Sequence, residues 1–482
     1  MKRVIAGIAA AVLMCGMLGG CGGEKSEEIP TLTWYVHGDA QTDVASVMEE
    51  VNKITVPEIG AKVDLKFIDQ AAFNEKMTMM MAANTEFDIC FTGYVNKYKS
   101  AVDKGGLLAL DEYLEKMPEL KNAVPEYLWN AAKYSGHIYA VPNEQIVAYA
   151  PHMYTFKDLA DKYGLDELNI ESLEDAEPYL EKIKQNEPDY YPFRSIYGIG
   201  NFNVSNSKHY VESLTSPVYA YYTPDGKVEK IVSKTHDEDF KHAAYKLYDW
   251  FRKGYIRPDN ASVTDDTQDQ NMGRYAVWVE KYKPGILDEM RIKYGKEVVS
   301  RPIAKPILYS TPPDAMTGVS RTSKNPEKAL KLIRLVNTDK KLYNLICFGI
   351  EGKHYNLDSD GRVVYVDNSG YAPKACWKFG NQFNALLLPG QPEDVWEQTR
   401  KMNEEAFKSP LAGFSIDTVP IRNDISAYTT VDAEYGIISK GAENPDKYYD
   451  EMVNRLDSVG AKKIEEEVLR QYDEWKKGGG GE

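Results

Sequence analysis

The sequence predicts an α/β protein built from two lobes, and three observations support this fold class. Strand and helix patterns alternate from residue 31 onward, as in sheets covered by helices. Roughly 450 residues follow an N-terminal leader, more than one hydrophobic core normally holds, so two domains are expected. Two proline-marked segments then indicate where the chain crosses between the lobes.

The first thirty residues predict export and a lipid anchor. Lys2 and Arg3 precede the apolar run Val4–Leu18, which is shorter than the ~20 residues of a membrane-spanning helix, so residues 1–20 are interpreted as a signal peptide. The run ends in Leu-Gly-Gly-Cys, which is typical of a lipoprotein signal cut before Cys21.

A diacylglycerol on the Cys21 thiol would hold the mature chain on the membrane, because two or more acyl chains anchor stably. The polar, glycine-containing residues 21–30 then form a flexible leash. The alternative is an ordinary cleaved signal peptide followed by a chance cysteine.

Composition excludes some classes of function. The formal charge of −15 becomes more negative once the basic leader is removed, and such a chain repels phosphate backbones, so no nucleic-acid partner is expected. The remaining cysteines, Cys90, Cys347 and Cys376, are too few and too scattered for a disulfide framework. We interpret Cys90 and Cys347 as small buried hydrophobic residues.

The first lobe begins with a βαβα pattern. Thr31–Val36 predicts a strand, and apolar residues at helical spacing follow over Val44–Ile54. Val63–Phe67 alternates as a strand, Phe73–Ala83 predicts a helix with a methionine-rich packed side, and Phe87–Phe91 predicts a buried strand. Ligands of open α/β sheets bind beyond the carboxyl ends of strands. That position nominates His37, Asp39 and Tyr94 as binding residues.

The crossings are predicted from turn and proline signals. A short strand ends at Pro142, so Asn143 and Glu144 would lie at the first crossing. The proline-rich segment Ala304–Gly318 would return the chain to the first lobe. Further on, Asn325 and Pro326 begin a helix, Asp339 caps the next one, and Gly349 ends it.

These signals give the following division. The first lobe comprises residues 31–142 and 316–375, and the second comprises 143–315 and 376–477, including helices near Pro445–Leu456 and Ala461–Lys476. The glycine-rich residues 478–482 are expected to be disordered.

Local motifs spread over nearly all the mature chain carry a resemblance to a known family. They are Thr33–Asp39, Glu86–Thr92, Ile138–Asn143, Lys324–Ala329, Gly349–Tyr355, Leu456–Ile464 and Gln471–Trp475. The chain resembles the extracellular solute-binding lipoproteins of the type 2 periplasmic-binding-protein superfamily, most closely the Gram-positive subgroup with a C-terminal DUF3502 domain. The resemblance implies a Venus-flytrap fold, a ligand cleft between the lobes, and delivery to the permease subunits of an ABC importer.

Sugar recognition is the chemistry that the residue usage favours. Tyrosine outnumbers phenylalanine, 34 to 14, and an aromatic with a polar tip suits a wet cleft that stacks on sugar rings. Trp278 and Tyr282 lie where a strand breaks into a turn, and Trp377 and Asn381 lie where the chain is expected to recross. The competing interpretation makes each tryptophan a core residue.

No catalytic constellation is evident. The seven histidines lack metal-ligand spacing, and there is no phosphate loop or nucleophile elbow, so neither a metal nor a cofactor is expected. We therefore expect a monomeric, non-enzymatic binding protein for an oligosaccharide. Peptides or other small polar solutes are the alternative ligands, and a surface glycoside hydrolase is the alternative of another class.

Overall fold

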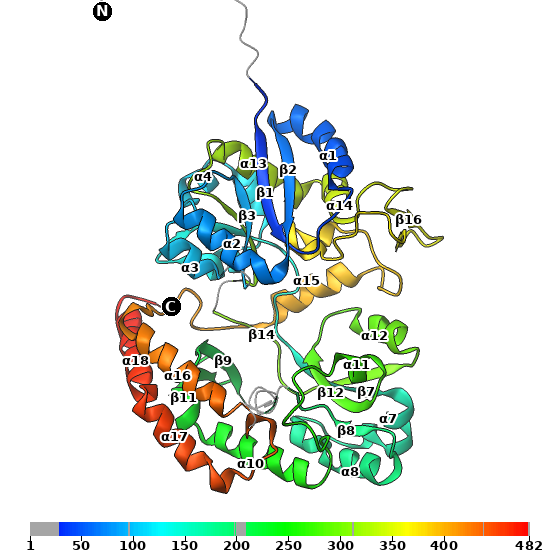
Figure 1. Cartoon of the computed structure of the whole chain (residues 1–482), viewed down its shortest axis with the longest axis vertical. Coiled ribbons are helices and arrows are strands. Elements are labelled where there is room, and N and C mark those ends of the chain that lie inside the picture. The colour runs from blue at the N-terminus through cyan, green and yellow to red at the C-terminus, as the bar shows by residue number, and fades with distance from the viewer. Residues whose placement is uncertain are drawn as a thin grey trace, which may run out of the picture.

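The computed structural model describes residues 28–94, 97–196, 198, 209–310, 313–436 and 438–480. The signal peptide, Cys21 and most of the leash lie outside the described residues. Figure 1 shows two α/β lobes, one above the other, with β14 and α15 between them.

The first lobe contains a sheet with the strand order β2-β1-β3-β15-β6. β1 runs parallel to β2 and β3, whereas β15 lies antiparallel between β3 and β6. The strands are β1 (Thr31–His37), β2 (Lys62–Ile68), β3 (Ile89–Gly93), β6 (Ala140–Pro142) and β15 (Ala315–Val319), with small hairpins β4 (Lys133–Tyr134) and β5 (His137–Ile138), and β16 (Tyr355–Leu357) and β17 (Val363–Tyr365). The helices are α1 (Val44–Ile59), α2 (Gln70–Ala82), α3 (Tyr98–Asp103), α4 (Asp111–Glu115), α5 (Pro118–Ala123), α6 (Glu126–Ala132), α13 (Pro326–Thr338) and α14 (Lys340–Phe348).

Local sequence signals explain several of these elements. The Asp339 side chain accepts hydrogen bonds from the backbone N–H groups of Lys341 and Leu342, and Gly349 ends α14, as the sequence predicts. Pro326 occupies the first turn of α13, but Asn325 makes no side-chain cap bond. In α2, Met77 and Met81 are buried against the sheet, so the methionines pack in the core.

The second lobe contains two sheets, with strand orders β13-β7-β12-β8 and β11-β10-β9. The strands are β7 (Pro151–Phe156), β8 (Tyr191–Phe193), β9 (Tyr210–Thr215), β10 (Val218–Tyr222), β11 (Val228–Ser233), β12 (Tyr275–Lys281) and β13 (Val298–Pro302). The helices are α7 (Lys157–Tyr163), α8 (Glu177–Asn186), α10 (Glu238–Arg252), α11 (Thr267–Asn271), α12 (Ile286–Tyr294), α16 (Arg422–Glu434), α17 (Tyr449–Ser458) and α18 (Ala461–Lys477). The C-terminal helices pack beside β11 and contribute Leu456, Ile464 and Val468 to this lobe's core (Figure 1).

The described chain passes between the lobes in three segments that pair with one another. The backbone of Tyr149 bridges Ile307, and β14 (Ile307–Leu308) pairs in parallel with β18 (Phe407–Lys408). α15 (Val395–Glu405) precedes β18 and lies against this ribbon (Figure 1). Leu308 and Ala406, together with Ala148, form a small core of their own at the crossing.

One boundary between the lobes differs from the sequence prediction. The segment from residue 376 was assigned to the second lobe, but Phe379 and Ala385 are buried in the core of the first, and the chain crosses only after α15. This crossing consists of the two residues of β18, which pair with β14 and include no proline, so the sequence carries no local signal for it. Gly478 and Gly480 hydrogen-bond back to the last turn of α18, so residues 478–480 form a turn. Residues 481 and 482 lie outside the described residues, and the disorder expected for residues 478–482 stays a prediction.

Candidate ligand-binding cleft

A cavity of about 510 Å³ lies where the two lobes and the crossing segments meet. Tyr94, Leu128 and Trp377 line it from the first lobe, and Lys281 and Tyr309 line it from the second. The crossing segments supply the other walls, with Gln145, Ile146, Val147, Leu308, Lys408 and Ser409. The cavity volume falls within the range of about 300 to 1,000 Å³ that small-molecule sites occupy.

Tyr94 and Trp377 form an aromatic wall of the cavity. Their ring centroids lie 6.1 Å apart, and the Tyr94 side chain is 46% exposed although it is large and apolar in body. The imidazole of His37 lies behind both rings, at 5.8 Å from Tyr94 and 5.7 Å from Trp377. An exposed aromatic pair held on a packed base offers flat faces to a ligand.

His37 supports this wall from inside the core and does not line the cavity. Burial, with a smaller contribution from the nearby Lys378 ammonium, lowers the pKa of His37 to about 4, so the ring is neutral at pH 7. Neither ring nitrogen has a hydrogen-bond partner among the described residues. Phe91, at 4.7 Å between centroids, completes the aromatic packing around it.

The backbone at the end of β3 explains where Tyr94 points. Gly93 adopts φ +133°, and a Cβ there would lie 2.0 Å from the carbonyl oxygen of Asp314. The same carbonyl accepts a hydrogen bond from the Tyr94 N–H, at 3.0 Å. Glycine therefore allows the close approach of two strands that turns Tyr94 toward the cavity.

Asn143 positions Trp377, the second aromatic residue of the wall. Its Nδ2 donates to the carbonyl of Trp377 at 3.0 Å, and its Oδ1 accepts from the Thr317 hydroxyl at 2.9 Å. Asn143 is 1% exposed, so its amide is committed to the protein. The predicted ligand-binding residue therefore lies behind the cleft and positions Trp377.

Glu144 is buried at the start of the crossing. Asn381 Nδ2 donates to Glu144 Oε2 at 2.7 Å, and Arg400 Nε lies 3.9 Å from Oε1. Burial raises the pKa of Glu144 to about 7, although Arg400 and Asn381 oppose the shift. Neither Glu144 nor Asn381 lines the cavity, whereas the next residues along the chain do.

The prediction that Trp278 is a cleft platform is wrong, because it is a core residue of the second lobe. Trp278 is 2% exposed and stacks on Tyr154 at 5.9 Å, with Phe156 and Tyr294 on its other sides. Five consecutive residues of β12 are buried, so both faces of this strand are covered. The residue types therefore do not indicate which face of the strand Trp278 points to.

The remaining candidates lie outside the cavity wall. Tyr282 stacks on His152, with ring centroids 4.3 Å apart. Asp39 is exposed at the end of β1. Of the ligand-binding residues predicted from sequence, the structure brings Tyr94 and Trp377 together at the cavity, and the sugar-binding role of each stays a prediction.

Sequence reasoning missed Tyr127, Lys281, Tyr309, Asp314 and Lys408, which all line the cavity. Lys281 is the last residue of β12, directly after the buried run, so its position at a strand end was an available signal. Asp314 and Tyr309 lie on the predicted return crossing, where the prolines indicate only that no long helix or strand forms. Tyr127 and Lys408 come from a short helix and a two-residue strand that carry little pattern.

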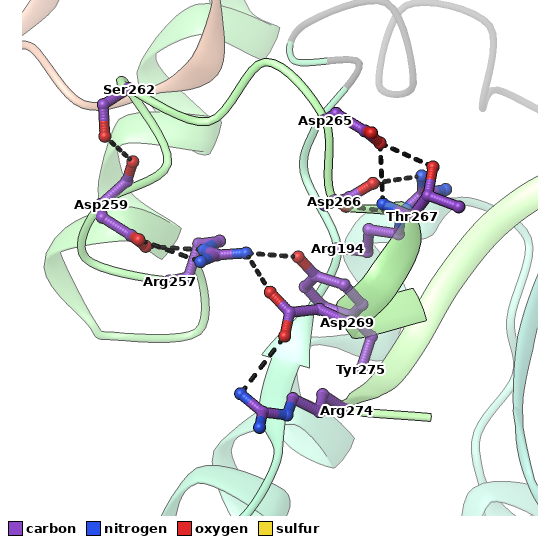
Figure 2. Close-up of polar contacts among 10 residues, drawn as sticks. All are labelled: Arg194, Arg257, Asp259, Ser262, Asp265, Asp266, Thr267, Asp269, Arg274 and Tyr275. Atoms are coloured by element: carbon purple, nitrogen blue, oxygen red, sulfur yellow. Dashed lines mark hydrogen bonds and ion pairs between the residues drawn. The ribbon is translucent and has the colours of Figure 1, made fainter. Parts of the chain in front are cut away.

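A network of arginine and aspartate side chains lies between the carboxyl end of β8 and the amino end of β12 (Figure 2). The Arg194 guanidinium makes a bidentate pair with Asp266, at 2.8 and 2.7 Å, and both residues are buried. Arg257 joins Asp269 to the Tyr275 hydroxyl in the same network. Arg194 Nη1 also lies 3.9 Å from Glu280 Oε1, so the network reaches the residue that precedes Lys281.

In the described part of the chain, no group of three or more histidine, cysteine, aspartate or glutamate side chains is arranged to hold a metal ion. None of the helices described is long and apolar enough to cross a membrane.

Comparison with known proteins places this geometry in a family. The sequence profile described as "Bacterial extracellular solute-binding protein" matches residues 44–341, more than half of the chain. The chain belongs to this family of extracellular solute-binding proteins. A second profile, "Domain of unknown function (DUF3502)", matches residues 410–477, which contain α16 to α18.

Relatives from Streptococcus pneumoniae cover nearly the whole chain. The "Carbohydrate ABC transporter substrate-binding protein" of the serotype 4 strain TIGR4 is 27% identical over 98% of this chain and 97% of its own length. The crystal structure of the N-glycan transport solute-binding protein NgtS is 27% identical, with a TM-score of 0.81 over 93% of this chain and 99% of that chain. NgtS in complex with Man5GlcNAc gives 26% identity and a TM-score of 0.69 over the same shares of the two chains.

Proposed function

We propose that this solute-binding protein captures an oligosaccharide in the interlobe cavity and delivers it to the permease subunits of an ABC importer. The observation that carries the proposal is the aromatic wall of Tyr94 and Trp377 on a cavity between lobes. Amide groups of Asn130 and Gln145 line the same cavity and can pair with sugar hydroxyls. The carbohydrate-transport relative and the glycan complexes of NgtS support the same ligand class.

The protein acts as a monomer outside the cell, held to the membrane through a lipid on Cys21. Membership of an extracellular family and the leader sequence support this location. Cys21→Ala should release the protein into the soluble fraction without changing ligand affinity, because the residues lining the cavity are all distant from Cys21 in sequence. A Cys21→Ala protein that still sediments with membranes would contradict the anchor.

A thermal-shift screen tests the ligand class. A ligand present at 100 times its dissociation constant adds about 2.7 kcal/mol to the free energy of unfolding. Oligosaccharides should raise the melting temperature, and oligopeptides of similar size should not. Reducing-end release from the bound sugars is measured in parallel, because turnover would favour the glycoside hydrolase alternative.

A further inference from the structure

Lys281 places an uncommitted ammonium on the cavity wall. Its side chain is largely enclosed, and burial lowers its pKa. It forms no ion pair within 4.0 Å with any carboxylate of the described residues. Lys408, on the same wall, differs because its Nζ donates to the carbonyl oxygens of Glu404, at 2.6 Å, and Ala406, at 3.3 Å.

Asp314 faces the same cavity from the segment that leads into β15 of the first lobe. Its carboxylate is exposed and, within the described chain, makes no ion pair of its own. Its charge opposes the lowering of the Lys281 pKa by burial, and it adds to the rise that burial causes in the pKa of Tyr94. Among the described residues, the cavity therefore presents one cation and one anion without an ion-pair partner, from opposite lobes, beside the aromatic wall.

We propose that Lys281 and Asp314 are the specificity-determining polar pair of this cleft, and that they select a neutral, hydroxyl-rich sugar unit over an anionic one. This inference rests on the proposed oligosaccharide function. An ammonium can only donate hydrogen bonds and a carboxylate can only accept them, whereas a sugar hydroxyl does both. Neighbouring hydroxyls of one sugar unit satisfy Lys281 and Asp314 together.

Asp314 disfavours an acidic sugar at this position. A carboxylate on the ligand could pair with Lys281, but it would then face the Asp314 carboxylate, and like charges repel. The formal charge of the chain, −15, also disfavours the approach of an anion. When a neutral sugar binds, its hydroxyl oxygens instead accept charge-assisted hydrogen bonds from the Lys281 ammonium.

Calorimetric titration with matched oligosaccharides tests the pair. Each neutral probe, such as a manno-oligosaccharide, is compared with the oligosaccharide of equal length and linkage in which C6 is oxidised to a carboxylate, here an oligomannuronate. A β-1,4-linked gluco-oligosaccharide and the β-1,4-linked oligoglucuronate of equal length form a second such pair. The wild-type protein should bind the neutral member of at least one pair more than tenfold tighter than its acidic counterpart.

The variants Lys281→Met and Asp314→Asn should each weaken neutral binding by about 10- to 100-fold, the effect of losing a hydrogen bond to a charged group. Asp314→Asn should reduce the difference in affinity between the neutral and the acidic member of a pair, and Lys281→Met should not. Lys283→Gln is the control, because Lys283 lies two residues further along and pairs with Glu289 at 2.8 Å, outside the cavity. Its affinities should match the wild type.

Tighter binding of the acidic member would overturn the inference while leaving the oligosaccharide function standing. Loss of affinity for both members in equal proportion, with a larger radius of gyration in the ligand-bound variants, would assign Lys281 and Asp314 to an ion pair between the lobes. The absence of binding to any oligosaccharide in the thermal-shift screen would remove the proposed function and this inference together.

Discussion

Trp278 and Trp377 have opposite surroundings, although both were predicted to face the cleft. Trp278 is enclosed between β7 and α12, whereas Trp377 is half-buried on the cavity wall. An aromatic face stacked on a flat ligand contributes about 1 to 3 kcal/mol. A buried tryptophan truncated to alanine costs about 3 to 5 kcal/mol of stability.

Trp377→Ala should therefore raise the dissociation constant by about 5- to 150-fold and change the melting temperature little. Trp278→Ala should lower the melting temperature sharply while the folded fraction keeps its affinity. Calorimetric titration and thermal melting of the same two proteins measure both effects. If Trp377→Ala behaved like Trp278→Ala, the aromatic wall would belong to the core.

Glu144 makes stability depend on pH in the direction opposite to that of an ordinary paired carboxylate. Its pKa is raised from 4.5 to about 7, mainly by burial, so its contribution is fully present below pH 4.5 and is lost as the pH rises through 7. The loss is on the order of 3 kcal/mol. Glu144→Gln stays neutral and can still accept from Asn381.

The free energy of unfolding of Glu144→Gln, relative to the wild type, should thus increase between about pH 5 and pH 7.5 and then level off. Urea denaturation at a series of pH values measures it. A difference that is constant across the series would mean that the Glu144 carboxyl keeps an ordinary pKa in the folded protein.

At the scale of elements, α15 fixes the crossing segment that lines the cavity. Asn403 Oδ1 accepts from the N–H groups of Val147 and Ala148, both at 3.0 Å, and Nδ2 donates to the Gln145 carbonyl at 2.6 Å. Asn403 is completely buried. Removing its amide leaves these backbone groups unpaired, at about 1 to 3 kcal/mol each.

Asn403→Ala should consequently lower both the melting temperature and the ligand affinity, the latter on the order of tenfold. Asn344→Ala is the matched control, because Asn344 bridges backbone groups of Asn384 and Leu386 inside the first lobe, away from the cavity. It should lower the melting temperature alone. Equal loss of affinity in both variants would mean that α15 stabilises the fold without shaping the cleft.

Elements with strong periodicity could be predicted from the sequence, and the crossings could be predicted only in part. The strands and helices from β1 to β3 follow the expected order because each carries a full pattern of buried positions. The third crossing depends on two residues of β18 pairing with β14, and long-range pairing of this kind has no local signature. Tyr94 could be predicted because it directly follows a strand, whereas Lys281 ends a strand whose buried run gives no sign of which face meets the cavity.

For the whole molecule, the ribbon of crossing segments at Tyr149, Ile307 and Phe407 is the expected hinge. Two lobes that are joined by a few paired segments can change their relative position when a ligand binds between them. We expect the radius of gyration in solution scattering to fall when the bound oligosaccharide reaches saturation. Trp377→Ala, at the same sugar concentration, should show a smaller fall, and an unchanged radius in the wild type would indicate a rigid site.

The position of β15 in the first sheet also governs the order in which the chain can fold. β15 fills the place between β3 and β6, so the sheet that begins at residue 31 cannot be completed until residue 319 has emerged. The core of the second lobe likewise cannot be completed until Leu456, Ile464 and Val468 have been synthesised. Neither lobe is a contiguous stretch that could fold during synthesis, and a chain whose cores close only near its end remains unfolded for most of its passage across a membrane.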